Sequence, residues 1–155
     1  MLDGLFVTPA VVAVSEALAA AARGRSPAAG SGEREAIAVV GNAKLAAALA
    51  ATHDVLPVGM SARAVKKLPR NVPDTSGLDP ASLSAVIGVD IATDGAWAET
   101  LRAWSRVVRD GGVIAFLDRG HAEEASRRAL CAGLCELEQR HAGRTIITSG
   151  LVTHL

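Results

Sequence analysis

The side chains best suited to chemistry stand where apolar runs of the sequence end. Asp90 is the last residue of the apolar run 83–90, and Gly41 closes the run 36–41 and is followed by Asn42. Ligands of open α/β sheets bind outside the carboxyl ends of the strands. Asp90 could act there as a hydrogen-bond acceptor or as a base, and the missing Cβ atom of Gly41 would let a ligand approach backbone N–H groups. The alternative for Asp90 is an aspartate that closes a turn or caps a helix.

The histidines and cysteines lack the spacing of a metal site. The four histidines belong to separate stretches of the chain and form neither an HxH nor an HExxH pair: His53, His121, His141 and His154. Cys131 and Cys135 lie four residues apart in a helical pattern, and we expect them to be small, buried apolar side chains. The sequence therefore predicts neither a metal centre nor a structural disulfide.

The charge balance disfavours a nucleic-acid partner. The 155 residues carry 16 basic and 16 acidic side chains, so the formal net charge is zero, whereas general DNA and RNA binders present a strongly basic face. One basic cluster falls on a helical face and consists of Arg63, Lys66, Lys67 and Arg70. This cluster could bind phosphate or an acidic partner, and the alternative is an ordinary solvated helix face.

The N-terminal stretch predicts the compartment. No lysine or arginine precedes Arg23, so the basic region of a secretory signal is missing. The apolar stretch 11–22 is interrupted by Ser15 and Glu16 and is shorter than the ~20 residues that cross a bilayer. We therefore expect a cytoplasmic protein without a membrane span. Arginine far outnumbers lysine and alanine is abundant, which suggests a bacterial genome rich in G and C.

The length predicts a single domain, because ~150 residues is a common domain size and buries enough surface for stability without a metal or a disulfide. We expect residues 1–35 to form an N-terminal helix and a flexible linker, and residues 36–155 to form an α/β core. Thr8 and Pro9 are typical of a helix start, which predicts the first helix at 9–23.

The elements that must position these residues alternate between strands and helices. Apolar runs predict strands at 36–41, 54–60, 83–90 and 113–117. Helical patterns predict helices at 44–51, 61–67 and 93–110, and a long amphipathic helix at 121–140. Residues 144–148 and 151–155 flank Ser149 and Gly150, which predicts a terminal hairpin. The order indicates an α/β fold: a doubly wound, mostly parallel Rossmann-like sheet with helices on both faces and a C-terminal antiparallel hairpin.

Two tryptophans lie on one face of the expected helix 93–110. Trp97, Leu101, Trp104 and Val108 are separated by four, three and four residues and therefore line up. We expect this face to be core. The alternative is a surface for a partner helix or a second copy of the chain.

The segment 83–117 resembles a known family. An apolar strand, the acidic turn at Asp90, a helix that ends in the stretch 104–112 (Trp-Ser-Arg-Val-Val-Arg-Asp-Gly-Gly) and a strand at 113–117 follow one another. This order is similar to the class I S-adenosylmethionine-dependent methyltransferases, in which the segment consists of a strand, a helix, Arg-apolar-apolar-x-x-Gly-Gly and a strand. The resemblance covers roughly residues 36–155, and it implies the fold more directly than an activity.

The resemblance also implies a cofactor site, of which two parts are missing. In the family, the methionine end of the cofactor lies over a glycine-rich turn after the first strand. Here only Gly41 remains of those glycines, and Ala43 and Lys44 would place side chains in the ligand's position. The family usually carries an acid at the end of the second strand for the ribose hydroxyls, and the matching residue here is Gly59 or Met60.

No other acid of that strand replaces the missing one, since Asp54 lies at its opposite end. Losing a bidentate charge-assisted contact costs on the order of 2–3 kcal/mol, about two decades of affinity. At the substrate edge, Asp90 is not followed by the two prolines and the aromatic residue that are common in amino-directed methyltransferases.

These gaps predict a non-catalytic methyltransferase-like domain that binds no cofactor. It would act through protein–protein association, as a scaffold, regulator or partner subunit in a homo- or hetero-oligomer. The alternative is an active methyltransferase with an atypical S-adenosylmethionine site, which holds the cofactor at Gly41, Asn42, Gly59 and Asp90 and places Asp90 near the transferred methyl group. A third interpretation is a small nucleotide-binding module built on the Gly41 turn.

Overall fold

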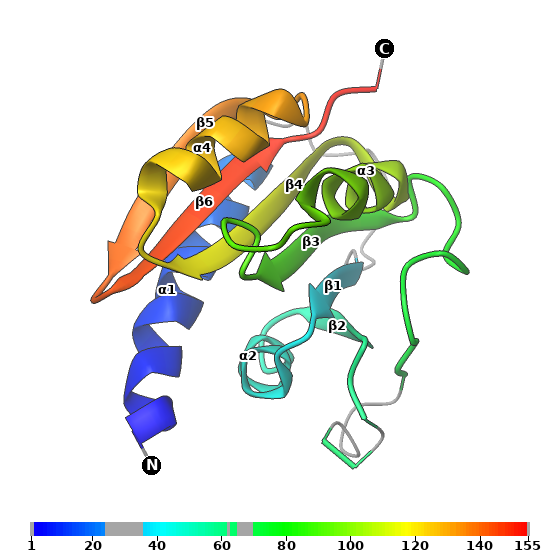
Figure 1. The fold of residues 1–155 in the computed structure, drawn as a ribbon. Helices are drawn as coiled ribbons and strands as arrows, with labels where there is room; N and C mark the ends of the chain where they lie inside the picture. Colours follow the sequence, from blue (N-terminus) through cyan, green and yellow to red (C-terminus); the bar gives the residue numbers. More distant parts are fainter. Residues whose placement is uncertain (1, 24–35, 62, 65–69, 155) are drawn as a thin grey trace.

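A six-stranded sheet forms the centre of the molecule. The structure is a computed structural model that describes residues 2–23, 36–61, 63–64 and 70–154. The strands are β1 (Ala36–Val40), β2 (Asp54–Val58), β3 (Leu83–Val89), β4 (Val108–Arg119), β5 (Cys135–Ala142) and β6 (Thr145–Leu151). Their order is β2-β1-β3-β4-β6-β5 (Figure 1). The first four are parallel, and β6 lies antiparallel between β4 and β5. The expected fold class is confirmed.

Helices cover both faces of this sheet. α1 (Leu2–Arg23) and α2 (Ala43–Leu49) pack on one face, and α3 (Trp97–Val107) and α4 (Ala122–Cys131) pack on the other (Figure 1). In β3, Ala85 and Ile87 join the apolar cluster under α1 and α2, whereas Val86 joins the cluster under α3 and α4. A strand buried on both faces must be apolar throughout, which is why its run could be recognised. Among the described residues, no helix combines the length and apolar character that crossing a bilayer requires.

Trp104 joins α3 to the central strand β3. Its side chain is 4% exposed, and a Cβ atom at Gly88 would lie only 2.0 Å from its ring carbon Cη2. The ring therefore lies directly on the backbone of β3. Trp97 is only partly buried, and the guanidinium carbon of Arg128 lies 5.2 Å from the centroid of its ring. The expectation of core tryptophans is thus confirmed for Trp104 and holds in part for Trp97.

The first helix begins earlier than predicted. α1 starts at Leu2, and Pro9 lies inside it, so the expected start at Thr8 and Pro9 is wrong. A proline inside a helix removes one backbone hydrogen bond. The helix tolerates this loss because Val14 and three alanines near it are buried against the sheet. The predicted linker falls in residues 24–35, outside the described residues.

The connection from α3 to β4 is tighter than predicted, because β4 begins where α3 ends. The predicted closure at 110–112 therefore lies within the strand. Gly111 has a φ of +78° and donates its N–H to the Val152 carbonyl at 2.8 Å. At Gly112 a Cβ atom would lie 2.7 Å from the Ser84 carbonyl oxygen. The two glycines let β4 bulge where it passes β3.

The helix predicted at 121–140 is wrong in its second half. α4 ends at Cys131, and Gly133 follows with a φ of +87°. Gly133 N–H donates to the Leu130 carbonyl at 3.0 Å, and Leu134 N–H donates to the Ala129 carbonyl at 3.1 Å. These two bonds are those of a Schellman motif, which ends a helix with glycine in the left-handed region.

Residues 135–142 form β5 instead of continuing the helix. Cys131 and Cys135 therefore end one element and begin the next, and both are exposed free thiols. The expectation that they are buried in one helix is wrong.

The terminal hairpin is confirmed as a motif but lies elsewhere than predicted. It joins β5 to β6 through residues 143–144, and Ser149 and Gly150 lie in the middle of β6. A Cβ atom at Gly150 would lie 2.7 Å from Leu137 Cδ2 and 2.8 Å from Leu134 Cβ. Gly150 thus serves close packing and not a turn.

The predicted helix 61–67 can be followed only in part. Ser61 Oγ accepts a hydrogen bond from Ala64 N–H at 3.2 Å, as a cap would, and residues 62 and 65–69 lie outside the described residues. Lys66 and Lys67 of the basic cluster are among those. Arg70 donates to the Asp54 carboxylate at 3.3 Å.

Candidate functional site

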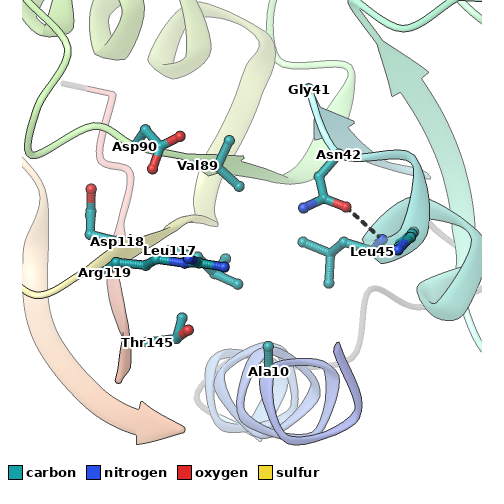
Figure 2. A pocket seen from close by; sticks show the side chains of 11 residues that line it. Ala10, Gly41, Asn42, Leu45, Val89, Asp90, Leu117, Asp118, Arg119 and Thr145 are labelled. Atoms are coloured by element: carbon teal, nitrogen blue, oxygen red, sulfur yellow. Dashed lines mark hydrogen bonds between the residues drawn. The ribbon is translucent and has the colours of Figure 1, made fainter. Parts of the chain in front are cut away.

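The carboxyl ends of β1, β3 and β4 border a cleft at the point where the strand order reverses. The chain passes from β1 outward to β2 and then returns across β1 to β3. Such a switch point is the usual ligand site of a doubly wound sheet. The cleft has a volume of about 610 Å³, within the range of small-molecule sites, roughly 300–1,000 Å³. Figure 2 shows the side chains that line it.

The turn after β1 forms one wall of the cleft. Gly41 has a φ of +76° and donates its N–H to the Val58 carbonyl at 3.0 Å. Asn42 caps α2, because its Oδ1 accepts a hydrogen bond from Leu45 N–H at 3.0 Å (Figure 2). The left-handed turn by itself requires glycine at position 41. The oxygen of Asn42 is therefore committed to the helix.

The two side chains expected to fill the cofactor position, those of Ala43 and Lys44, differ in whether they line the cleft. Lys44 lines the cleft, as does the buried side chain of Leu45. Ala43 is not among the residues that line it. A Cβ atom at Gly41 would meet only Val89 Cγ2, at 3.9 Å, so the turn leaves open space beside Gly41.

The end of β2 does not belong to the cleft. Gly59 is exposed, does not line the cleft, and donates its N–H to the Val72 carbonyl at 2.9 Å. The Met60 carbonyl accepts a hydrogen bond from Asn71 Nδ2 at 2.8 Å. Asp54 lies at the start of β2, where Arg70 binds it. The structure therefore brings Gly41, Asn42 and Asp90 together and leaves out Gly59.

Asp90 follows β3 in the left-handed region, with a φ of +59°. Its N–H donates to the Leu117 carbonyl at 2.9 Å, and its exposed side chain lines the cleft. Asp90 begins a turn, because its carbonyl accepts the Thr93 N–H at 3.4 Å, but it caps no helix, since the N-cap of α3 is Ala96. The carboxylate of Asp90 has no hydrogen-bond partner among the described residues.

Sequence reasoning missed Asp118, which also lines the cleft. Asp118 is 2% exposed, and its Oδ1 accepts a hydrogen bond from Ala92 N–H at 2.8 Å. Its Oδ2 is buried without a hydrogen-bond partner. Burial raises the pKa of this carboxyl, and the charge of Asp90 raises it further, against the opposing hydrogen bond of Ala92. The signal was an aspartate directly after the run 113–117.

Arg119 and Thr145 were missed as well. The two residues face each other across the β4–β6 ladder, and both line the cleft. Figure 2 shows the Arg119 side chain extending past Leu117 toward α2. Both residues also border a second cavity of about 930 Å³ at the tip of the β5–β6 hairpin. The hairpin was predicted with its turn at Ser149 and Gly150, so the sequence offered no reason to place Thr145 beside Arg119.

The histidines stay apart in the structure. His154 lies within hydrogen-bond distance of the Val108 carbonyl, with its Nε2 at 2.7 Å, and His53 lies beside Thr52. Within residues 2–23, 36–61, 63–64 and 70–154, no three His, Cys, Asp or Glu side chains are grouped as metal ligands would be.

Comparison with known proteins identifies the fold. No family model matches the chain, and no curated protein sequence matches it. Solved structures do. A complex between the Haloferax volcanii Trm112 methyltransferase activator and a putative methyltransferase has a TM-score of 0.65 at 16% identity, over 89% of this chain and 90% of that one. A methyltransferase from Thermotoga maritima, described as a possible histamine N-methyltransferase, has a TM-score of 0.63 at 13% identity, over 86% and 87%.

A third structure, a putative methyltransferase from Methanococcus maripaludis, has a TM-score of 0.62 at 10% identity, over 78% of each chain. All three neighbours are described as methyltransferases. The chain therefore has a class I S-adenosylmethionine-dependent methyltransferase-like fold, as the resemblance implied. Identities this low establish the fold alone.

Proposed function

We propose that this domain does not use S-adenosylmethionine as its fold neighbours do and works through association with another protein subunit, as a scaffold, regulator or non-catalytic partner. The observation that carries the proposal is the lack of an acidic side chain at the end of β2. Gly59 and Met60 offer no side-chain carboxylate there, and Gly59 N–H is already bonded to the Val72 carbonyl. A ribose placed beside them would lack a charged acceptor for its hydroxyl groups.

The turn after β1 supports the same conclusion. Its Asn42 oxygen is committed to Leu45 N–H, and the Leu45 side chain, which is 2% exposed, forms part of the wall. A methionine carboxylate would need backbone donors that a glycine-rich turn presents openly. Here one glycine precedes a capped helix.

Association with a protein is compatible with the size and the fold of the chain. The Haloferax volcanii neighbour is a methyltransferase structure in which an activator protein takes part, and it is matched over 90% of its length. That assembly belongs to the neighbour. It shows that a fold of this kind can work in a two-protein complex.

Calorimetric titration with S-adenosylmethionine tests the first half of the proposal. We expect no saturable binding at millimolar ligand, because both the acid and the open glycine turn are missing. Micromolar affinity would overturn it. Light scattering over a range of protein concentrations tests the second half. A concentration-dependent mass supports self-association, and a constant monomer mass would exclude a homo-oligomer.

A second candidate is an active methyltransferase with an atypical site. The observation that favours it is the cleft itself, which is retained at the switch point with the unpaired carboxylate of Asp90 at its edge. Gly41 and Asn42 would then lie near the methionine end of the cofactor, and Asp90 near the transferred methyl group. Methyl transfer that is lost in Asp90→Asn, while cofactor binding persists, would support this candidate.

A further inference from the structure

We propose that the cavity at the tip of the β5–β6 hairpin, which adjoins the cleft, binds a small phosphorylated molecule, held by Arg119 and Arg144. This goes beyond the proposed function, which assigns no ligand to the chain. The two cavities share Arg119 and Thr145. The second cavity, of about 930 Å³, is also lined by His141 and Arg144. Basic side chains from β4, β5 and the hairpin turn therefore border this second cavity.

Arg119 and Arg144 lack the contacts that other arginines of the described chain make. Five of the described arginines bind a carboxylate or a backbone carbonyl: Arg70, Arg106, Arg127, Arg128 and Arg140. Arg119 and Arg144 have no hydrogen-bond or ion-pair partner among the described residues. In a chain with equal numbers of acidic and basic side chains, two unpaired arginines at one cavity indicate a place for an anion.

The ladder explains how the two arginines come together. Arg119 is the last residue of β4 and pairs directly with Thr145, the first residue of β6. Arg144 precedes Thr145 in the hairpin turn, next to Gly143 with a φ of +64°. Neighbouring strands lie about 5 Å apart, so the two arginines start from adjacent backbone positions. An anion that lies between two guanidinium groups is attracted by both.

Asp118, the acid next to Arg119 in the chain, points away from it. Leu117 belongs to the apolar cluster under α1 and α2, and Phe116 belongs to the opposite cluster. Because side chains alternate along a strand, Asp118 points to the side of Phe116, where Ala92 N–H binds its Oδ1. Arg119 points to the side of Leu117, as Figure 2 shows. No carboxylate is among the described residues that line the hairpin cavity.

The side chains that line the hairpin cavity suit a phosphate group on a small molecule. A guanidinium group offers a planar fork of donors that matches phosphate oxygens, and the hydroxyl of Thr145 can add a further hydrogen bond. Binding of single-stranded nucleic acid relies on aromatic side chains that stack on bases. No Phe or Trp is among the described lining residues of either cavity.

Titration of the full chain with inorganic pyrophosphate at low salt, followed by NMR shifts or calorimetry, tests the proposal. We expect saturable binding, stronger than that of inorganic phosphate. Arg119→Gln and Arg144→Gln should each weaken it by about tenfold or more, the effect of one charge-assisted contact. Both residues are exposed, so thermal unfolding should stay unchanged in both variants.

Arg102→Gln is the matched control. Arg102 is exposed on α3, lies outside both cavities, and has no partner among the described residues. It removes the same charge and should leave pyrophosphate binding unchanged. The proposal is overturned by an absence of saturable binding, by equal weakening in Arg102→Gln, or by a short RNA that binds more tightly through the same arginines. S-adenosylmethionine carries no phosphate, so its separate titration decides the proposed function independently.

Discussion

Among the single residues, Asp118 carries a carboxyl group that is buried at the edge of the cleft. One of its oxygens binds Ala92 N–H and the other is buried without a partner. Burial disfavours the charged form of a carboxyl group, and the pKa of Asp118 is raised for this reason first. The carboxyl group therefore holds its proton to a higher pH in the folded state than in the unfolded chain.

This shift makes the stability of the protein depend on pH with a definite sign. Between the ordinary aspartate pKa and the raised folded pKa, the native state binds more protons than the unfolded state. The stability contributed by Asp118 is thus present at low pH and is lost as the pH rises through that interval. Asp118→Asn keeps an oxygen for Ala92 N–H and does not titrate, so it should be at least as stable as the parent at pH 7.

Urea unfolding from about pH 4.5 upward checks this prediction, because the free energy of unfolding should fall less steeply with pH in Asp118→Asn. The pKa of Glu124 is lowered to about 2 by hydrogen bonds from Arg127 and Arg128. Its contribution is lost as the pH falls from the ordinary glutamate value toward 2, which is below the interval measured. A variant that keeps the parent's slope and loses stability at pH 7 would contradict the assignment.

Among the elements, the buried strands could be predicted from the sequence, but the edge strand β5 was predicted as part of a helix. The runs 36–41 and 83–90 are apolar because both of their faces are covered, and the structure places β1 and β3 there. The segment 135–142 consists mostly of residues that favour a helix, with Glu, Leu, Gln, Arg and Ala among them. Pairing with β6 across the hairpin turn stabilises the strand, and the periodicity of residues 135–142 alone does not report this pairing.

The candidate site follows the same rule. Gly41, Asn42 and Asp90 were found because each stands at the end of a strand that the sequence predicts. Arg119 and Thr145 were missed because they meet only through the antiparallel ladder between β4 and β6. The expected hairpin was displaced by several residues, so no local signal brought them together.

Gly133 ends α4 and so sets the boundary between this helix and β5. Its φ of +87° costs an alanine about 1–2 kcal/mol, partly offset by the lower entropy of the unfolded chain. Gly133→Ala should therefore destabilise the protein by about 1 kcal/mol in urea unfolding. Gly95→Ala is the control, because nothing lies within 4 Å of its added Cβ atom and its φ is not left-handed. Equal losses of stability in Gly133→Ala and Gly95→Ala would show that the left-handed glycine does not determine where α4 ends.

For the whole fold, Trp104 is the side chain that packs α3 directly onto the backbone of β3. An added Cβ atom at Gly88 would lie 2.0 Å from the ring, so α3 or the strand would have to move. Overpacking of this kind costs about 1–3 kcal/mol, and we expect Gly88→Ala to lie at the upper end because backbone and ring are both buried.

A double-mutant cycle measures this contact. Trp104→Leu leaves a cavity of its own and should cost about 3 kcal/mol. In Gly88→Ala combined with Trp104→Leu, the new methyl group enters part of that space, so the double variant should be more stable than the sum of the single effects by about 1 kcal/mol. Strict additivity in urea unfolding would show that the two side chains do not compete for one volume.

β6 is inserted between β4 and β5, although α4 and the whole of β5 precede it in the chain. Until residues 145–151 dock, one side of β4 presents backbone N–H and C=O groups without partners. A hairpin donated by a neighbouring molecule would satisfy them in the same register, from Val113 to Arg119. Refolding at high concentration therefore favours reciprocal strand exchange, a route to paired molecules that requires no dedicated contact surface.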